Sequence, residues 1–230
     1  MEGAKAGYMT VEGLGPHDHA VLIYQSQVER LAAVVPYLKA GLERNERCLL
    51  VADPGSVEPL LAALGQSGVD AAGAVRGRKL LVLPPAEVYL NEGRFDHERV
   101  LTLYRNAVDE ALAQGFSAVR ATAEAAWSCG GVVAMQTLAD YEAEINRLFR
   151  ELPLGALCQY EYGRFAADAL TKVVYTHPLV IFGGKMRWNP FYIPPEEYLR
   201  PRDPAIELTR ILGTLSRTPA LAERPASVPA

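Results

Sequence analysis

The segment RATAEAAW, from Arg120 to Trp127, places a cation, a carboxylate and a large aromatic side chain directly after the strand-like run FSAV. Open α/β sheets bind ligands outside the carboxyl ends of their strands. A charge buried at a strand end must be paired with another side chain or contact a ligand, because burying it alone is energetically costly. The segment therefore predicts either an internal ion pair between Arg120 and Glu124 or a polar contact to a ligand. Trp127 fits either the core or a stacking contact with that ligand.

Further polar and aromatic residues lie at or beside the ends of other predicted strands. We expect them to converge on one edge of the sheet, where they would line a pocket with an aromatic wall and a few fixed polar groups, as small-molecule sites do. Together with Arg120, Glu124 and Trp127, the predicted ligand-binding residues are His19, Tyr24, Cys158, Gln159, Tyr160, His177, Asn189 and Tyr192. No residue is predicted to be catalytic.

Several of these side chains also have ordinary structural roles open to them. Cys158 lies in an apolar run, where a lone thiol is more often a core residue than a ligand. On a predicted amphipathic helix, a solvated or capping role is favoured for Glu142 and Asn146. His177 precedes Pro178 and suits a hydrogen-bonded hinge at a helix end. The four histidines are too dispersed for their spacing to indicate a metal site, so metal ligands and cofactors stay undetermined.

Motifs for phosphate binding and for common hydrolytic chemistry are missing from the sequence. The first predicted strand leads into YQSQVER, which has neither the glycines that expose backbone N–H groups to phosphate nor a Lys-Ser or Lys-Thr pair. The sequence also contains no GxGxxG, GxSxG or HExxH motif. ATP hydrolysis is therefore not expected, and the protein is more consistent with a binding module than with an enzyme.

Strand-like and helix-like segments alternate along the chain. This order predicts parallel crossovers and a sheet covered on both faces, which is a doubly wound α/β fold with a mostly parallel sheet. Ser56 and Asp96 are expected to cap helices, Pro36 falls inside a helical pattern, and Gly183-Gly184 should turn a C-terminal hairpin. The predicted strands are 19–24, 47–53, 79–85, 116–122 and 155–162 with the hairpin 179–188; the predicted helices start near 27, 56, 96, 132, 166 and 204.

Length and composition favour one globular domain with extensions. The chain has 230 residues, half of them apolar and 22% charged. The net charge of −4 and the scattered cations argue against nucleic acid as a direct partner, and no run approaches a membrane span. The three cysteines are expected to be thiols, and a cytoplasmic location is expected. We predict a flexible N-terminus over 1–16, a domain over 17–200, and a C-terminal helix with a disordered tail over 201–230.

An ordered set of segments resembles the MEDS family, the methanogen/methylotroph DcmR sensory domain. The set comprises HAVLIYQS, LKAGLERNERCLLVAD, YLNEGRFD, RATAEAAW, YEAEIN, ALCQYEYGRF, THPLVIFGG and NPFYIPPEEYL. The resemblance implies a RecA-like or KaiC-like three-layer core without a P-loop, serving as a sensory module in signal transduction or transcriptional regulation. Its partners would be kinases, anti-sigma-type ATPases or other regulators. Members of the family often carry a cysteine where this chain has Val21.

Three functions remain open from the sequence. The leading hypothesis is a sensory domain that binds a small-molecule ligand and relays the change to a signalling partner, with a metal or haem at His19, His177 or Cys158 as a variant. The second is an interaction module that pairs with itself as a homodimer or with another protein through the helix at 204–215. The third is an enzyme that uses Glu124 as a general base beside His177 or Cys158.

Overall fold

The computed structural model describes residues 10–201 and 203–217. Within this part of the chain, seven strands form one sheet in the order β3-β2-β6-β7-β1-β8-β9, and all neighbouring strands are parallel except β8 and β9. The predicted α/β fold with a mostly parallel sheet is confirmed. The strands are β1 (His19–Tyr24), β2 (Arg47–Val51), β3 (Leu80–Leu83), β6 (Val119–Glu124), β7 (Leu154–Glu161), β8 (Leu179–Phe182) and β9 (Lys185–Trp188).

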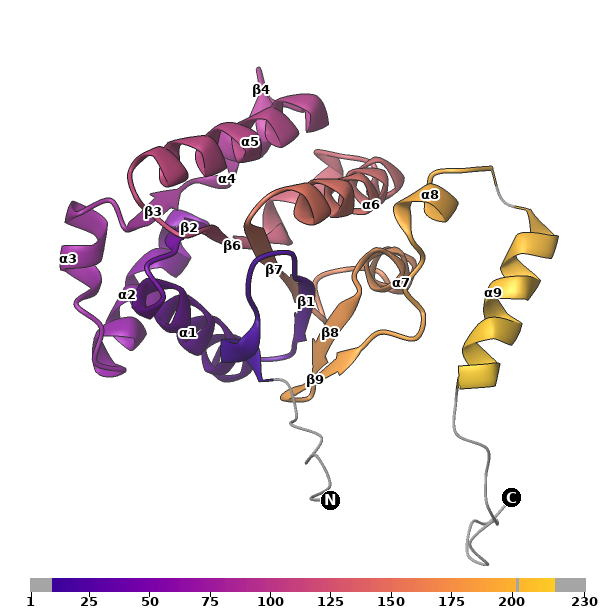
Figure 1. Cartoon of the computed structure of the whole chain (residues 1–230), viewed down its shortest axis with the longest axis horizontal. Helices are drawn as coiled ribbons and strands as arrows, with labels where there is room; N and C mark the ends of the chain where they lie inside the picture. Colours follow the sequence, from indigo (N-terminus) through magenta and orange to yellow (C-terminus); the bar gives the residue numbers. More distant parts are fainter. Residues whose placement is uncertain (1–9, 202, 218–230) are drawn as a thin grey trace, which may run out of the picture. The chain divides into compact units, whose positions relative to one another are not determined.

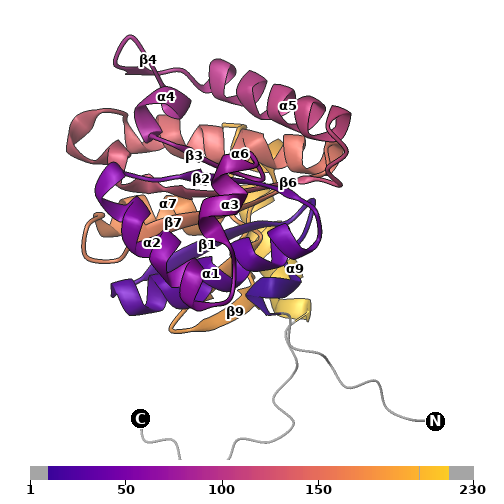
Figure 2. The same cartoon turned by 90° about the vertical axis from the view of Figure 1, so that its left-hand side faces the viewer.

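Helices cover both faces of the sheet, which gives three layers (Figures 1 and 2). One face packs against α1, α2 and α3, and the other against α5, α6 and α7, because alternate residues of each buried strand point to opposite sides. The helices are α1 (Gln27–Glu43), α2 (Pro54–Gln66), α3 (Ala71–Arg76), α4 (Pro85–Tyr89), α5 (His97–Ala113), α6 (Met135–Glu151), α7 (Ala167–Thr176) and α8 (Pro195–Tyr198). A small antiparallel pair, β4 (Leu90–Asn91) and β5 (Arg94–Phe95), separates α4 from α5.

Local sequence signals explain most element boundaries. Asp96 caps α5 by accepting a hydrogen bond from the backbone N–H of Arg99, as predicted. The hairpin turns at Gly183 and Gly184, both with positive φ, which matches the twist of the adjoining strands. α1 continues through Pro36. The prediction that Ser56 caps α2 is wrong: α2 begins at Pro54, and the Ser56 hydroxyl instead donates to Glu124.

Part of the segment predicted to be a flexible N-terminus packs against the domain. Val11–Gly13 form one turn of 3-10 helix, and Leu14 is only 1% exposed in the core beside α1. The chain divides into two compact units, Met1–Leu199 and Arg200–Ala230. In the second unit, α9 (Pro204–Arg217) is the predicted C-terminal helix; the predicted disordered tail lies outside the described residues from 218 on. Among the helices that the structure describes, none has the length and apolar character needed to cross a membrane.

Candidate metal centre

The residues predicted to form one pocket divide between the two faces of the sheet. Tyr24, Arg120, Glu124 and Gln159 point toward α1 and α2, whereas His19, Trp127, Cys158, Tyr160 and His177 lie on the side of α5, α6 and α7. His19 and Arg120 also lie at the amino-terminal ends of β1 and β6, not at the carboxyl ends. The structure therefore separates these residues into distinct polar groups and does not gather them in one pocket.

Arg120 is a structural residue at the amino-terminal end of the sheet. Its guanidinium pairs with the Glu46 carboxylate, donates to the carbonyl oxygens of Tyr37 and Leu14, and lies over the Tyr37 ring. Gly41 of α1 passes so close that a Cβ there would overlap the Arg120 side chain. The expected pairing of Arg120 with Glu124 is wrong, because four residues along a strand separate the two by about 13 Å.

Glu124 belongs to a second group, which we call the arginine cluster: Arg30, Ser56, Thr122, Glu124 and Gln159. Arg30 pairs with one carboxylate oxygen of Glu124, and Ser56 donates to the other. Arg30 also donates to Gln159, which in turn donates to Thr122. Because both oxygens of Glu124 are engaged and its side chain is on the opposite face from His177 and Cys158, the arrangement does not assemble the enzyme site considered from the sequence.

The loop between β1 and α1 is closed by side chains where a phosphate-binding protein exposes backbone N–H groups. Ser26 accepts a hydrogen bond from the N–H of Glu29, and the Glu29 carboxylate accepts one from the N–H of Gln25. Tyr24, at the end of β1, is buried in the core on the same side as α1. These contacts agree with the absence of a P-loop motif from the sequence, because they occupy backbone N–H groups that a phosphate would otherwise bind.

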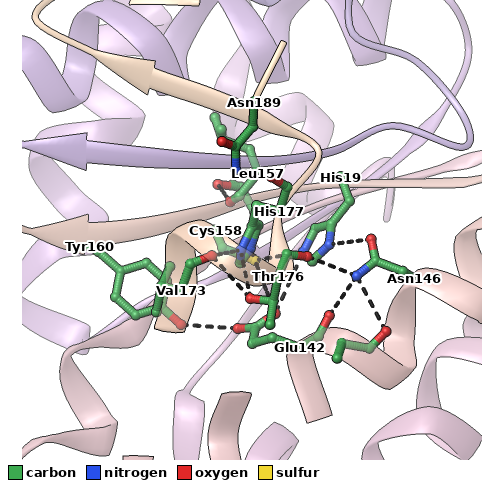
Figure 3. A network of polar contacts seen from close by, with 12 residues as sticks. His19, Glu142, Asn146, Leu157, Cys158, Tyr160, Val173, Thr176, His177 and Asn189 are labelled. Carbon is green, nitrogen blue, oxygen red and sulfur yellow. Dashed lines mark hydrogen bonds and ion pairs between the residues drawn. The ribbon is translucent and has the colours of Figure 1, made fainter. Parts of the chain in front are cut away.

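On the other face, four side chains of types that can bind a metal converge, and we call them the histidine cluster: His19, Glu142, Cys158 and His177 (Figure 3). One ligand atom from each lies within 4.8 Å of the other three. The Nε2 atom of His19 is 3.5 Å from the Cys158 sulfur and 3.5 Å from a Glu142 oxygen. The same Glu142 oxygen is 3.7 Å from Nε2 of His177 and 4.0 Å from the Cys158 sulfur.

Both histidines are held in the tautomer that a metal requires. Nδ1 of His19 lies 3.0 Å from the amide oxygen of Asn146, whose NH2 group donates to backbone carbonyls of Glu142, Ala143 and Thr176. Nδ1 of His177 lies 2.8 Å from the Val173 carbonyl oxygen. Since both partners are acceptors, each Nδ1 carries the proton and each Nε2 presents a lone pair. Such contacts orient metal-binding histidines in known sites.

The electrostatics of the cluster fit a cation. Burial lowers the pKa of His19 to about 4 and that of His177 to about 3, so both imidazoles are neutral near pH 7. Burial raises the pKa of Glu142 and that of Cys158. Nε2 of His177 is buried and makes no hydrogen bond within the described part of the chain. The cluster thus presents an unused lone pair and two acids that lack a cation partner there.

The donor set and its spacing suit a tetrahedral zinc-like ion. Zinc binds imidazole nitrogen, thiolate and carboxylate at about 2.0–2.3 Å, which places neighbouring ligand atoms roughly 3.3–3.8 Å apart. The closest contacts in the cluster already lie near this range. A divalent ion bound by one thiolate, one carboxylate and two neutral imidazoles has zero net charge, which limits the cost of burying it.

A small cavity adjoins the cluster on the side of Cys158, which is partly exposed to it. Its volume is about 10 Å³, near the lower limit for one water molecule. Trp127 lies in this wall and stacks on Tyr89 at 4.4 Å, with Phe95 nearby, so it packs as a core residue that also borders the cavity. The lining residues are Tyr89, Ala123, Glu124, Ala125, Trp127, Leu138, Glu142, Cys158 and Tyr160.

Tyr160 supplies an outer contact of the cluster, whereas the residues after the hairpin contact the end of α7 and α6. Tyr160 donates to the second carboxylate oxygen of Glu142 at 3.0 Å. Asn189 donates to the backbone carbonyl oxygens of Val174 and His177, so it fixes the end of α7. Tyr192 lies further along this segment and interacts with Arg150.

Sequence reasoning missed two members of this region, Glu142 and Asn146, for which a solvated or capping role was favoured. Both are buried. The signal that could have found them is their i, i+4 spacing on α6 beside the apolar Tyr141 and Ile145, which places polar tips on the helix face turned to the core. Cys158 is the register partner of Val21, so its sulfur comes from β7, beside β1.

Comparison with known families agrees with the fold and the sequence segments. The family model "MEDS: MEthanogen/methylotroph, DcmR Sensory domain" matches residues 18–178, which include every member of the histidine and arginine clusters. The chain therefore belongs to the MEDS family of sensory domains. A search of curated proteins gave no significant match.

Proposed function

We propose that this sensory domain reads a small ligand through a divalent metal ion of the zinc class held by His19, Glu142, Cys158 and His177. The observation that carries the proposal is the convergence of these four donors, with a buried Nε2 of His177 that has no hydrogen-bond partner in the described structure. Membership of the MEDS family supports the sensory role. The metal-binding variant is favoured over the predicted strand-end pocket because its ligand atoms are already oriented.

The chemistry of the site follows from its own residues. The two imidazoles offer neutral nitrogen donors, because their Nδ1 atoms are committed to Asn146 and Val173. Cys158 releases its proton when it binds the ion, so binding exchanges a proton for metal. Cys158 and Glu142 line the small cavity, and this is the side from which a small molecule could contact the metal centre.

Metal binding can be tested directly on the purified full chain. Native mass spectrometry and elemental analysis report any retained metal, and calorimetric titration of the chelator-treated protein with Zn²⁺ measures stoichiometry and affinity. We expect one ion per chain and a rise in the free energy of unfolding of about 2.7 kcal/mol at a free zinc concentration of 100 Kd. No binding of Zn²⁺, and no metal in the isolated protein, would contradict the proposal.

A matched pair of cysteine variants gives the control. Cys158→Ser replaces the proposed thiolate ligand and should abolish most of the zinc-dependent stabilisation, since zinc binds thiolate far better than a hydroxyl. Cys129→Ser changes a cysteine of the loop after β6, outside the histidine cluster, and should leave zinc binding unchanged. Equal loss in both variants would point to a nonspecific effect on folding.

Relay to a partner protein is the second half of the proposal. α9 supports it, because five of its apolar side chains are exposed within the second unit: Ile206, Leu208, Ile211, Leu212 and Leu215. Such a stripe favours an interaction with another protein or a second copy of the chain. Removing residues 200–230 should then abolish self-association or partner binding in size-exclusion chromatography while zinc binding persists.

A further inference from the structure

The chain leaves the sensory domain through the segment 189–199, which we call the exit segment. It follows β9, includes α8 and ends where the first compact unit ends, at Leu199. Two of its residues, Asn189 and Glu196, make polar contacts with the end of α7 and with α6, the helices that carry or adjoin His177 and Glu142. Glu142 belongs to α6, and His177 directly follows α7 as its C-cap residue.

The first attachment joins the exit segment to the end of α7. The side-chain NH2 of Asn189 donates to the carbonyl oxygens of Val174 at 2.5 Å and His177 at 2.7 Å. The backbone N–H of Asn189 donates to Pro178, and that of Ile193 donates to Tyr175. These bonds satisfy carbonyl groups that the helix end leaves free. A displacement of His177 therefore acts directly on the exit segment (Figure 3).

The second attachment joins the exit segment to α6. The Glu196 carboxylate of α8 receives both terminal nitrogens of Arg150, at 3.0 and 3.3 Å, and lies 3.8 Å from Arg147. Exposed ion pairs contribute little on their own, but a two-pronged arginine contact fixes direction as well as distance. Arg147 directly follows Asn146, and Arg150 lies one turn further along the helix that carries Glu142.

Metal binding requires the ligand atoms of the cluster to approach one another. They lie up to 4.8 Å apart, whereas tetrahedral zinc requires roughly 3.3–3.8 Å between neighbouring ligand atoms. Since His19, Glu142 and Cys158 lie within 4.0 Å of one another and Glu142 is already 3.7 Å from His177, the longest separation joins His177 to a ligand on the strands. The end of α7 must therefore shift relative to the sheet when the ion binds, and the exit segment, which is attached to His177 and to α6, must respond.

From these contacts we infer that the exit segment is the output element of the domain, through which occupancy of the histidine cluster is transmitted to the chain beyond Leu199. Asn189 acts as a positioning residue that works through His177, and Glu196 of α8 does the same through Arg150 of α6. The inference rests on the metal binding proposed above. It adds the direction in which the signal leaves.

Hydrogen exchange on the full chain tests the inference. Amide exchange of residues 189–199 is compared with and without saturating Zn²⁺, and we expect protection to rise at least several-fold for Ile193 and α8. Trp188, which is 70% exposed and directly precedes Asn189, gives a second signal through its fluorescence in a Trp127→Phe background. The double variant Asn189→Ala/Glu196→Gln should still bind Zn²⁺ but lose both responses.

The outcomes separate this inference from the proposed function. Zinc binding without any response of the exit segment, or a response that survives in the double variant, overturns the inference and leaves metal sensing intact. Failure of the unmodified chain to bind Zn²⁺ overturns both. Glu58→Gln, an exposed carboxylate change on α2, is the matched control and should keep both binding and response. Loss of the response in this control as well would overturn the specific role of Glu196.

Discussion

The arginine cluster and the histidine cluster are both buried, lie on opposite faces of the same sheet, and share the strand β7. In the arginine cluster, the charge of Glu124 meets Arg30, and Gln159 continues the network to Thr122. In the histidine cluster, two acids lie beside two neutral imidazoles, and Nε2 of His177 has no hydrogen-bond partner in the described chain. Neighbouring residues of one strand, Cys158 and Gln159, thus serve two different environments.

The difference separates a structural network from a candidate binding site. A buried polar network stabilises a protein only when its members satisfy one another. The arginine cluster meets this condition with its own side chains. The histidine cluster meets it when a cation is added, because the unused lone pair then gains a partner and the two acids become charged ligands. On one face of the sheet the polar side chains are paired with one another, and on the other face they would be paired only with a bound cation.

The largest effect is expected from breaking the arginine cluster. Arg30→Met leaves the Glu124 carboxylate buried without its cation, and it should lower the free energy of unfolding by about 3–5 kcal/mol in urea denaturation. The double variant Arg30→Met/Glu124→Gln should recover part of this loss, because no unpaired charge remains. Zinc affinity should stay within about 3-fold of the unmodified chain. A large loss of zinc affinity would show that the two faces are not independent.

An intermediate effect is expected for Glu142→Gln, which should keep the stability of the metal-free protein and lose the stabilisation by zinc. In the absence of metal, this variant should keep the free energy of unfolding within about 1 kcal/mol, because burial already raises the pKa of Glu142 and glutamine can still accept from Tyr160. In the presence of Zn²⁺ it should lose the stabilisation of about 2.7 kcal/mol expected at 100 Kd. Calorimetry with and without Zn²⁺ measures both values.

Glu144→Gln provides the control on the same helix. This residue lies outside the cluster and approaches the half-exposed His97. It should leave zinc-dependent stabilisation intact. If Glu142→Gln retained that stabilisation, Glu142 would not be a metal ligand.

The smallest effect is expected from an outer contact of the histidine cluster. Tyr160→Phe removes the hydroxyl that donates to Glu142 at 3.0 Å and keeps the aromatic packing with Phe165. Loss of one outer contact typically weakens metal binding about 10-fold or more, which calorimetric titration can resolve. Tyr162→Phe, at an exposed position, is the matched control. Unchanged zinc affinity in Tyr160→Phe would place its hydroxyl outside the metal site.

Sequence patterns predicted the fold well because its signals are local. The alternation of apolar strands with amphipathic helices, the Asp96 cap and the double-glycine turn each depend on a few neighbouring residues. Ser56 was misplaced because proline at the first helical position started α2 earlier. The boundary at residue 17 overlooked Leu14, whose burial depends on contacts with distant α1.

The candidate site was only partly predictable, for geometric reasons. His19, Cys158 and His177 were selected because they lie at or beside predicted strands, but their assignment to one edge of the sheet ignored which face each side chain occupies. Arg120 was assigned to the same edge, although it is the second residue of β6. Glu142 completes the cluster from α6, and the distance between a helix and a strand is set by packing that no short motif encodes.

The burial of the histidine cluster has a consequence in time. His19, Glu142 and His177 are almost fully enclosed, and the adjoining cavity is about 10 Å³. An ion cannot enter or leave without a local opening between α6 and the sheet, so exchange is limited by the frequency of that opening and not by diffusion. A sensor of this kind would respond to slow changes in metal concentration and would average over rapid ones. It would stay metal-bound for longer than its equilibrium affinity alone implies.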